Sequence, residues 1–377
     1  MLILVFSKYH QKQAQPYQII NTYIYGMKQK VTALLMDWHS RFNTRQMPWK
    51  GEKDPYKIWL SEIILQQTRV EQGMSYYQKF IATYPTITDL ANANDEAVFK
   101  LWEGLGYYNR CKNLLHTARI ISNEQYGRFP NAYDTIVSLK GIGPYTAAAI
   151  ASFAFNLPYA VVDGNVFRVL SRLFAINTPI DSTKGKQQFS LLAQEVLDKK
   201  NAALYNQAIM DFGATVCKPA NPQCNACHLQ SVCIGYSKAL VNKLPVKEKV
   251  LLKKSRWFYY FIIQYNDTVL VEKRITRDIW ENLYEFYLLE TTEQITWNET
   301  SIQEWLFQQL SIHKATILSI SSLQKQQLTH QLIKGQFIKV SISSIPKNLL
   351  KAQWQPLKEL QQLAFPKFIN QYLELNN

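Results

Sequence analysis

Four of the five cysteines fall within 17 residues of the chain, and this group constrains the fold more than any other feature. Cys217, Cys224, Cys227 and Cys233 follow the spacing C-x6-C-x2-C-x5-C, so four thiolates of one loop can surround a tetrahedral or cubane metal centre. Zinc sites usually pair cysteines about two to four residues apart, and the longer first gap counts against a zinc ribbon. The alternative is a set of unrelated buried thiols, which is the role we expect for Cys111.

The cysteines also indicate the compartment. A secreted disulfide framework scatters an even number of cysteines through a short chain, whereas an odd, clustered number favours a metal site in a reducing compartment. No apolar run approaches the roughly 18 residues of a membrane span. The N-terminal MLILVF has neither the basic region nor the cleavage site of a signal peptide. We therefore expect a cytoplasmic protein with no membrane partner.

The charge balance points to an anionic partner. Lys and Arg outnumber Asp and Glu by 42 to 28, which gives a net charge of +14 and favours nucleic acid or a membrane surface. Residues 238–256 hold seven of the basic residues and one acidic residue, whereas the chain beyond them is neutral overall. This basic segment is either a solvated linker or a direct contact to phosphates.

Length and periodicity predict two domains. The 377 residues are 47% apolar, enough for two cores. Apolar residues recur with a helical period through residues 27–236, so we expect an all-α domain there. Short β-rich runs alternate with helix-like stretches over residues 257–377, which predicts a smaller α+β domain after a basic linker at 237–256. Residues 1–26 lack periodicity, and we expect a flexible extension or a misplaced start, with translation from Met27.

The same patterns predict the individual elements. Asp54 as N-cap and Pro55 at the first helical position predict the start of the helix at 56–67. The other helices are expected at residues 31–42, 88–105, 110–126, 132–139, 144–155, 164–176, 203–217, 301–310 and 366–375. The strands are expected at residues 256–265, 268–274, 283–290 and 336–345.

Two glycines between helical patterns predict a phosphate-binding hairpin. Gly141 and Gly143 allow a tight turn whose backbone N–H groups can approach a phosphate, and Pro144 then opens a helix with its positive end at the same place. A Gly-x-Gly turn alone is weak support, since such turns join many helices. Asp163 follows 20 residues after Gly143, and it is either the N-cap of the next helix, a functional carboxylate, or both.

Glu62 is the second carboxylate of interest. Its helical neighbours are Ile58, Trp59 and Leu65, so it projects from an apolar face. Burial there would raise its pKa and keep it protonated near neutrality, as a general acid requires. The alternative is a carboxylate at the solvent edge of this face.

These residues resemble MutY-type adenine DNA glycosylases of the helix–hairpin–helix, iron–sulfur superfamily. The resemblance covers roughly residues 41–236 and includes the cysteine spacing. Its motifs are MPWK (47–50), DPYKIWLSEIILQQTRV (54–70), WEGLGYYNR (102–110), LKGIGPYTAAAI (139–150) and VVDGNVFRVLSR (161–172). Endonuclease III and its bifunctional relatives carry a Schiff-base lysine where this chain has Tyr145. The resemblance therefore implies a monofunctional glycosylase without lyase activity.

The family's roles carry over to matching positions. Glu62 would protonate adenine and later activate water, Asp163 would stabilise the oxocarbenium-like sugar, and Tyr145 would trap the sugar transiently. The four clustered cysteines would bind a 4Fe–4S cluster. The remaining DNA contacts implied are Trp49 and Gln207 in the adenine pocket, Gln67, Thr68, Leu105 and Tyr107 as wedges in the duplex, and Gly141 and Gly143 on the backbone.

The C-terminal part resembles the family's lesion-reading domain, which is related to Nudix hydrolases. Relatives carry an aromatic, a serine and a histidine where this chain has Leu328, Thr329 and His330. Thr329 and His330 would read 8-oxoguanine, although a histidine in a polar loop can be merely solvated. The acidic cluster of a Nudix hydrolase is reduced to Glu304, which argues against nucleotide hydrolysis. The expected partner is double-stranded DNA with A·8-oxoguanine or A·G mispairs, bound by a nucleoid-associated bacterial monomer.

Two other functions fit parts of the pattern. An endonuclease III-like pyrimidine glycosylase with lyase activity would share the cysteine loop and the hairpin, but Tyr145 and the extra domain argue against it. A non-catalytic DNA-binding protein would keep the scaffold alone, but Glu62 and Asp163 are both retained. The sequence does not disclose any protein partner.

Overall fold

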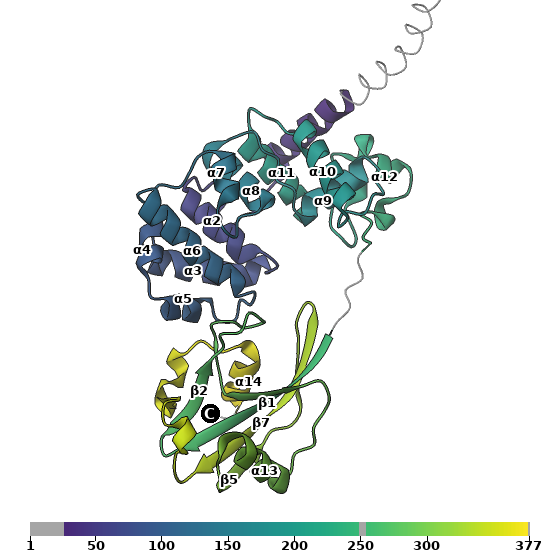
Figure 1. Cartoon of the computed structure of the whole chain (residues 1–377). Coiled ribbons are helices and arrows are strands. Elements are labelled where there is room, and N and C mark those ends of the chain that lie inside the picture. Colours follow the sequence, from purple (N-terminus) through teal and green to yellow (C-terminus); the bar gives the residue numbers. More distant parts are fainter. Residues whose placement is uncertain (1–25, 249–253, 376–377) are drawn as a thin grey trace, which may run out of the picture. The chain divides into compact units, whose positions relative to one another are not determined.

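The computed structural model (Figure 1) describes residues 26–248 and 254–375. The chain divides into two compact units. One unit lies within Met1–Gln67 and Asn123–Lys249, and the other lies within Thr68–Ser122 and Val250–Asn377. Residues 1–25 of the expected extension and 249–253 of the expected linker fall outside the described residues.

The first unit is helical, as the apolar periodicity predicts. One of its core clusters contains the buried side chains of Leu35, Leu170, Phe189 and Phe212. Helix α8 packs against α2, α7 and α11, and α11 also packs against α9. The helices cover residues 26–42, α2 Pro55–Leu65, α7 Tyr133–Ser138, α8 Pro144–Phe155, α9 Gly164–Leu173, α10 Thr183–Val196, α11 Ala202–Thr215 and α12 Ile234–Ser237. Short 3-10 helices cover Cys224–Ala226, Gln230–Val232 and Val241–Lys243.

The second unit includes four further helices: α3 Val70–Thr83, α4 Ile87–Asn92, α5 Asp95–Trp102 and α6 Asn109–Glu124. The expectation of one continuous helix over residues 88–105 is wrong. Ala93 is extended, with ψ 148°, and Asn94 begins a new helix by accepting hydrogen bonds from the N–H groups of Glu96 and Ala97. A short polar side chain inside an apolar pattern thus starts a helix instead of continuing one.

The rest of this unit is built on a mixed sheet, to which eight strands of the described residues belong. Strand β1 runs parallel to β7 and antiparallel to β2 and β4. Strands β5 and β6 pair with β7, and β3 and β8 pair with β2. The strands are β1 Lys254–Tyr265, β2 Thr268–Lys273, β3 Tyr284–Glu285, β4 Tyr287–Thr291, β5 Ala315–Ile320, β6 Gln324–Gln327, β7 Gln331–Ile342 and β8 Gln353–Pro356. The helices are α13 Glu299–Leu310 and α14 Lys367–Leu375, with 3-10 helices at Lys347–Leu349 and Leu357–Gln362.

Side chains of β1 alternate between two apolar layers, which explains why this strand is buried on both faces. Tyr259 and Phe261 join the cluster that includes Leu306 of α13. Tyr260 instead contacts Phe368 of α14. The expected α+β architecture is therefore confirmed. Among the described residues, no helix has both the length and the apolar content to cross a membrane.

Candidate active site and cysteine cavity

Glu62 lies on the buried face of α2, where it is only 7% exposed. The helix begins where expected, because the Asp54 carboxylate accepts a hydrogen bond of 2.9 Å from the Tyr56 N–H. Burial raises the pKa of Glu62 to about 7, and the negative charge of Asp163 adds to this increase, whereas a hydrogen bond from Tyr145 opposes it. The position is therefore the apolar one expected for a general acid, not the solvent edge.

Tyr145 lies in the first turn of α8, directly after the glycine hairpin. Its hydroxyl donates a hydrogen bond of 2.7 Å to Oε2 of Glu62. Burial, followed by the negative charges of Glu62 and Asp163, raises the pKa of Tyr145 well above its ordinary value. Gly141 has φ +80°, a left-handed backbone conformation that favours glycine. Both Gly141 and Gly143 are exposed. The hairpin is thus formed as expected, with its backbone accessible.

Asp163 is the N-cap of α9, so this structural role is confirmed. Its carboxylate accepts hydrogen bonds of 2.7 Å from the Val166 N–H and from Nδ2 of Asn165. Burial raises the pKa of Asp163, and these two hydrogen bonds oppose the increase. The carboxylate also raises the pKa of Glu62, so the two acidic groups that the sequence singled out lie close enough to interact.

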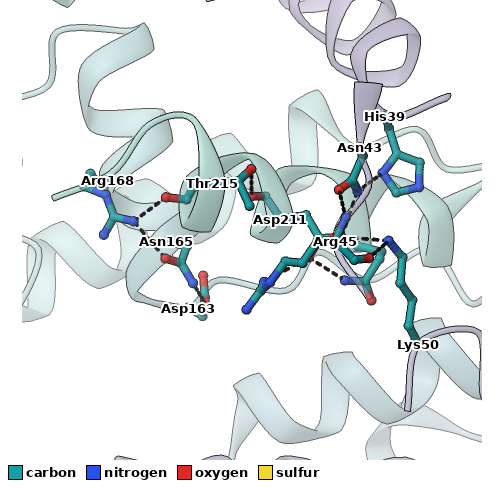
Figure 2. A network of polar contacts seen from close by, with 11 residues as sticks. His39, Asn43, Arg45, Lys50, Asp163, Asn165, Arg168, Asp211 and Thr215 are labelled. Atoms are coloured by element: carbon teal, nitrogen blue, oxygen red, sulfur yellow. Dashed lines mark hydrogen bonds and ion pairs between the residues drawn. The ribbon is translucent and has the colours of Figure 1, made fainter. Parts of the chain in front are cut away.

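Asn165 and Arg168, which Figure 2 shows beside Asp163, connect this group to the cysteine loop, and no sequence pattern had indicated this connection. One Arg168 N–H donates to Oδ1 of Asn165 at 2.8 Å, and its Nε donates to the Cys217 carbonyl at 2.8 Å. Arg168 is buried, at 8% exposure. An arginine inside the apolar pattern of VVDGNVFRVLSR is the signal that could have identified it, because a buried guanidinium needs several acceptors.

The four clustered cysteines line one cavity, whose wall also includes Leu229 and Tyr236. Arg172, buried beside it, donates to Sγ of Cys217 at 3.4 Å and to the Lys218 carbonyl at 2.8 Å. The shared cavity and the buried positive charge of Arg172 suit a metal group that is bound by several cysteine thiolates. Among residues 26–248 and 254–375, no three His, Cys, Asp or Glu side chains are arranged to hold a single metal ion.

Trp49 and Gln207, the two expected pocket residues, are both partly buried in the first unit. Gln207 lies on α11, where its Nε2 donates to Oδ1 of the buried Asp211 at 3.0 Å. Trp49 lies in a turn closed by a hydrogen bond of 3.0 Å from the Lys50 N–H to the Met47 carbonyl. No sequence pattern singled out Asp211, because it lies inside the apolar pattern of its helix.

The expected wedge residues differ in exposure. Gln67 is exposed at the end of α2 with φ +58°, and Thr68 follows it, half-buried. Leu105 is only 6% exposed, whereas Tyr107 is 42% exposed, with φ +50°. Tyr107 is therefore the more accessible of these two side chains.

Thr329 and His330 lie exposed in the turn between β6 and β7. The hydroxyl groups of Tyr107 and Thr329 form a hydrogen bond within the second unit. The His330 carbonyl accepts a hydrogen bond of 3.1 Å from the Lys254 N–H, which fixes the base of the turn and leaves the imidazole exposed. The structure thus brings one expected wedge residue together with one expected lesion-reading residue.

The first part of the basic segment is attached to the first unit. Arg172 Nε donates to the Leu244 carbonyl at 3.0 Å, and the Ile180 N–H donates to the Val246 carbonyl at 3.0 Å. The Glu248 N–H donates to Oδ1 of Asp181 at 3.0 Å, so hydrogen bonds hold this part of the segment at Leu244, Val246 and Glu248. Strand β1 begins at Lys254, within the segment expected to be a linker.

Comparisons with known proteins agree with this fold. Residues 60–195 match the HhH-GPD superfamily of base excision DNA repair proteins, and residues 259–375 match the NUDIX domain. The structure of a thermostable thymine-DNA glycosylase superimposes with a TM-score of 0.52 at 28% identity, over 56% of this chain and 98% of that one. The class is thus a helix–hairpin–helix DNA glycosylase, a hydrolase of N-glycosyl bonds that acts on DNA.

Two relatives identify the family within this class. The adenine DNA glycosylase of Buchnera aphidicola subsp. Baizongia pistaciae is 34% identical over 344 residues, which are 88% of this chain and 92% of that protein. The adenine DNA glycosylase of Buchnera aphidicola subsp. Schizaphis graminum is 33% identical over 91% of this chain and 97% of that protein. The chain belongs to the adenine DNA glycosylase family of base excision repair.

Proposed function

We propose that this enzyme removes adenine paired with 8-oxoguanine or guanine, and that Glu62, Asp163 and Tyr145 carry out the reaction. The observation that carries the proposal is the buried Glu62 carboxyl, which accepts a hydrogen bond from Tyr145 and has a pKa raised to about 7. A carboxyl group with this pKa can donate a proton and take one up again at neutral pH. The enzyme would act as a monomer in the bacterial cytoplasm.

The residues divide the chemistry between them. Glu62 protonates a ring nitrogen of the flipped adenine, so that the base leaves as a neutral molecule, and its carboxylate then takes a proton from the attacking water. Asp163 stays ionised and stabilises the positive charge that develops on the sugar. Tyr145 fixes Glu62 and can meet the sugar transiently. Since no lysine occupies the Tyr145 position, no Schiff base forms and the strand is left intact.

The test is base excision followed by hot alkali. Duplexes with A·8-oxoguanine, A·G or thymine glycol are incubated with the enzyme and then analysed with and without alkali. Strand cleavage of the two adenine substrates only after alkali is the expected result. Cleavage without alkali would indicate a lyase, and intact adenine strands throughout would reduce the protein to a binding module.

We infer that Cys217, Cys224, Cys227 and Cys233 hold a 4Fe–4S cluster in the cavity they line. Support comes from the shared cavity, from the buried Arg172 beside it and from the C-x6-C-x2-C-x5-C spacing. A cluster with four protein ligands has no open coordination position, so its role is structural. It would fix the loop on which Arg168 and Arg172 converge.

The anaerobically purified protein should contain about four iron atoms per chain and be brown, with broad absorption toward the blue end of the visible spectrum. Cys224→Ser should lower the iron content and the stability of the first unit. Cys111→Ser is the matched control, because this thiol is buried outside the cavity. Stoichiometric zinc without iron in the parent protein would refute the assignment.

We also propose that Thr329 and His330 read 8-oxoguanine. Their support is their exposure in one turn and the contact of Thr329 with Tyr107. His330→Ala should reduce the preference for A·8-oxoguanine over A·G by about fivefold, the low end for one base contact, because Thr329 compensates partially. The ratio of apparent affinities at fixed salt measures this. His313→Ala, another exposed histidine of the same unit, should keep the ratio, and an unchanged ratio in His330→Ala would exclude its role.

A further inference from the structure

Asp211 is a buried carboxylate with no part in the proposed mechanism. Its side chain is 0% exposed. It accepts hydrogen bonds from Asn43 Nδ2 at 2.8 Å, from an Arg45 N–H at 2.9 Å and from Gln207 Nε2 at 3.0 Å. Lys50 Nζ adds an ion pair at 3.3 Å. Figure 2 shows Asp211 beside Asn43, Arg45 and Lys50, which belong to the segment that precedes α2.

The chemistry of Asp211 determines how the amide of Gln207 is turned. An ionised carboxylate can only accept hydrogen bonds, so Gln207 must present its NH2 group to it. The amide oxygen is then the atom left to meet another molecule. Gln207 is partly exposed, and its oxygen has no hydrogen-bond partner among the described residues. Arg45 and Lys50 also contact this carboxylate and hold it in place.

The position of Gln207 relates this acceptor to the reacting groups. Helix α11 packs against α8 and α9, which begin at the sites of Tyr145 and Asp163. Met210, one turn along α11 from Gln207, joins the apolar cluster that includes Tyr145. Gln207 and Asp211 are separated by four residues, so both lie on the side of the helix near Met210.

We propose that Asp211 is a specificity-determining positioning residue that locks the Gln207 amide so that its oxygen faces the flipped base. This inference rests on the proposed role of Gln207 in the base pocket. A hydrogen-bond acceptor there can accept from the exocyclic amino group of adenine. It repels the carbonyl oxygen that hypoxanthine or guanine carries at the same place.

Asp211 also holds the other wall of that pocket. Arg45 and Lys50 flank the turn that carries Trp49, and Lys50 Nζ donates to the Arg45 carbonyl at 2.6 Å as well as pairing with Asp211. One carboxylate therefore attaches the Trp49 segment to α11. Gln207 and the segment that carries Trp49 are thus held by the same carboxylate.

The decisive experiment compares adenine with hypoxanthine in otherwise identical duplexes. Asp211→Asn keeps the shape but offers both a donor and an acceptor, so the Gln207 amide can turn over. The ratio of single-turnover excision rates, adenine over hypoxanthine, should fall by about tenfold, within the range of one base contact. A loss of folded protein lowers both rates together and leaves this ratio unchanged. Asn43→Ala, which removes a different donor from the same carboxylate, should also leave it unchanged.

Gln207→Met separates the proposal from the pocket assignment on which it rests. It should lower the same ratio, and adding Asp211→Asn to it should lower the ratio no further. An unchanged ratio in Gln207→Met would remove Gln207 from the pocket. A lowered ratio in Gln207→Met together with a parental ratio in folded Asp211→Asn would overturn the role of Asp211 alone.

If Asp211→Asn does not fold, the parent protein still provides a test. With 15N-labelled glutamine, the side-chain NH2 signal that disappears in Gln207→Met belongs to Gln207. Slow exchange of its protons with solvent is expected for an NH2 group held by a buried carboxylate. Proton exchange as fast as that of exposed glutamines would refute the proposal that Asp211 holds the amide of Gln207 in one orientation.

Discussion

Glu62→Gln is expected to abolish adenine excision while leaving the affinity for A·8-oxoguanine duplexes nearly unchanged. The amide keeps the shape and can still accept the hydrogen bond from Tyr145. It has no acidic proton to give to the base and cannot take one from water. General acid–base catalysis contributes about 10²–10⁴-fold in rate, and because Glu62 acts in both steps we expect the upper end.

Single-turnover excision and equilibrium binding measure the two effects separately. Glu124→Gln, an exposed carboxylate at the end of α6, is the control and should match the parent in both. Above pH 7 the parental rate should fall about tenfold per pH unit, since the pKa of Glu62 is about 7 and only the protonated form donates. Substantial excision by folded Glu62→Gln would assign the acid role to another group.

The same burial determines how Glu62 affects stability. The pKa of Glu62 is about 7 in the folded protein and 4.5 ordinarily, so the folded chain retains a proton that the unfolded chain releases. The stability linked to this proton is present below pH 4.5 and is lost as the pH rises through 7. Glu62→Gln should therefore have a higher free energy of unfolding than the parent at pH 8 and a similar one at pH 4, as measured in urea.

Local signals in the sequence predicted the parts of the site that depend on helix geometry. Asp54–Pro55 marks the start of α2, and the apolar neighbours of Glu62 imply its burial, because both depend only on residues within one or two turns. The hairpin at Gly141 and the capping role of Asp163 follow for the same reason. The roles of these residues could therefore be predicted without knowing which helices pack together.

The rest depends on contacts between distant segments, which periodicity does not encode. Asp211 meets Arg45 and Lys50 across more than 160 residues of chain, and nothing near Asp211 in the sequence indicates those partners. Helices α3 and α10 were not among the expected segments. Strand β6, QKQQ, has no apolar residue and forms because β7 supplies its hydrogen-bond partners. Whether such elements form depends on their contacts with the rest of the fold.

Asp163→Asn is expected to separate the capping role of this residue from its charge. Asparagine caps helices as well as aspartate does, so the Val166 N–H keeps an acceptor and α9 should begin at the same place. The negative charge is lost, and with it the stabilisation of the positive sugar in the transition state. Removing one such electrostatic group lowers rates by about 10²–10³-fold. Single-turnover excision should fall by this factor, with little change in the melting temperature.

One side effect of this substitution needs its own control. The second oxygen of Asp163 accepts from Nδ2 of Asn165, whose Oδ1 is already occupied by Arg168. Asn165 cannot turn its amide without losing Arg168, so Asp163→Asn also breaks this hydrogen bond. Asn165→Ala breaks the same bond but keeps the charge, and its rate should stay well above that of Asp163→Asn. If the two variants lose activity equally, Asp163 serves to hold the connection to Arg168 and the cysteine loop, and its charge does not stabilise the sugar.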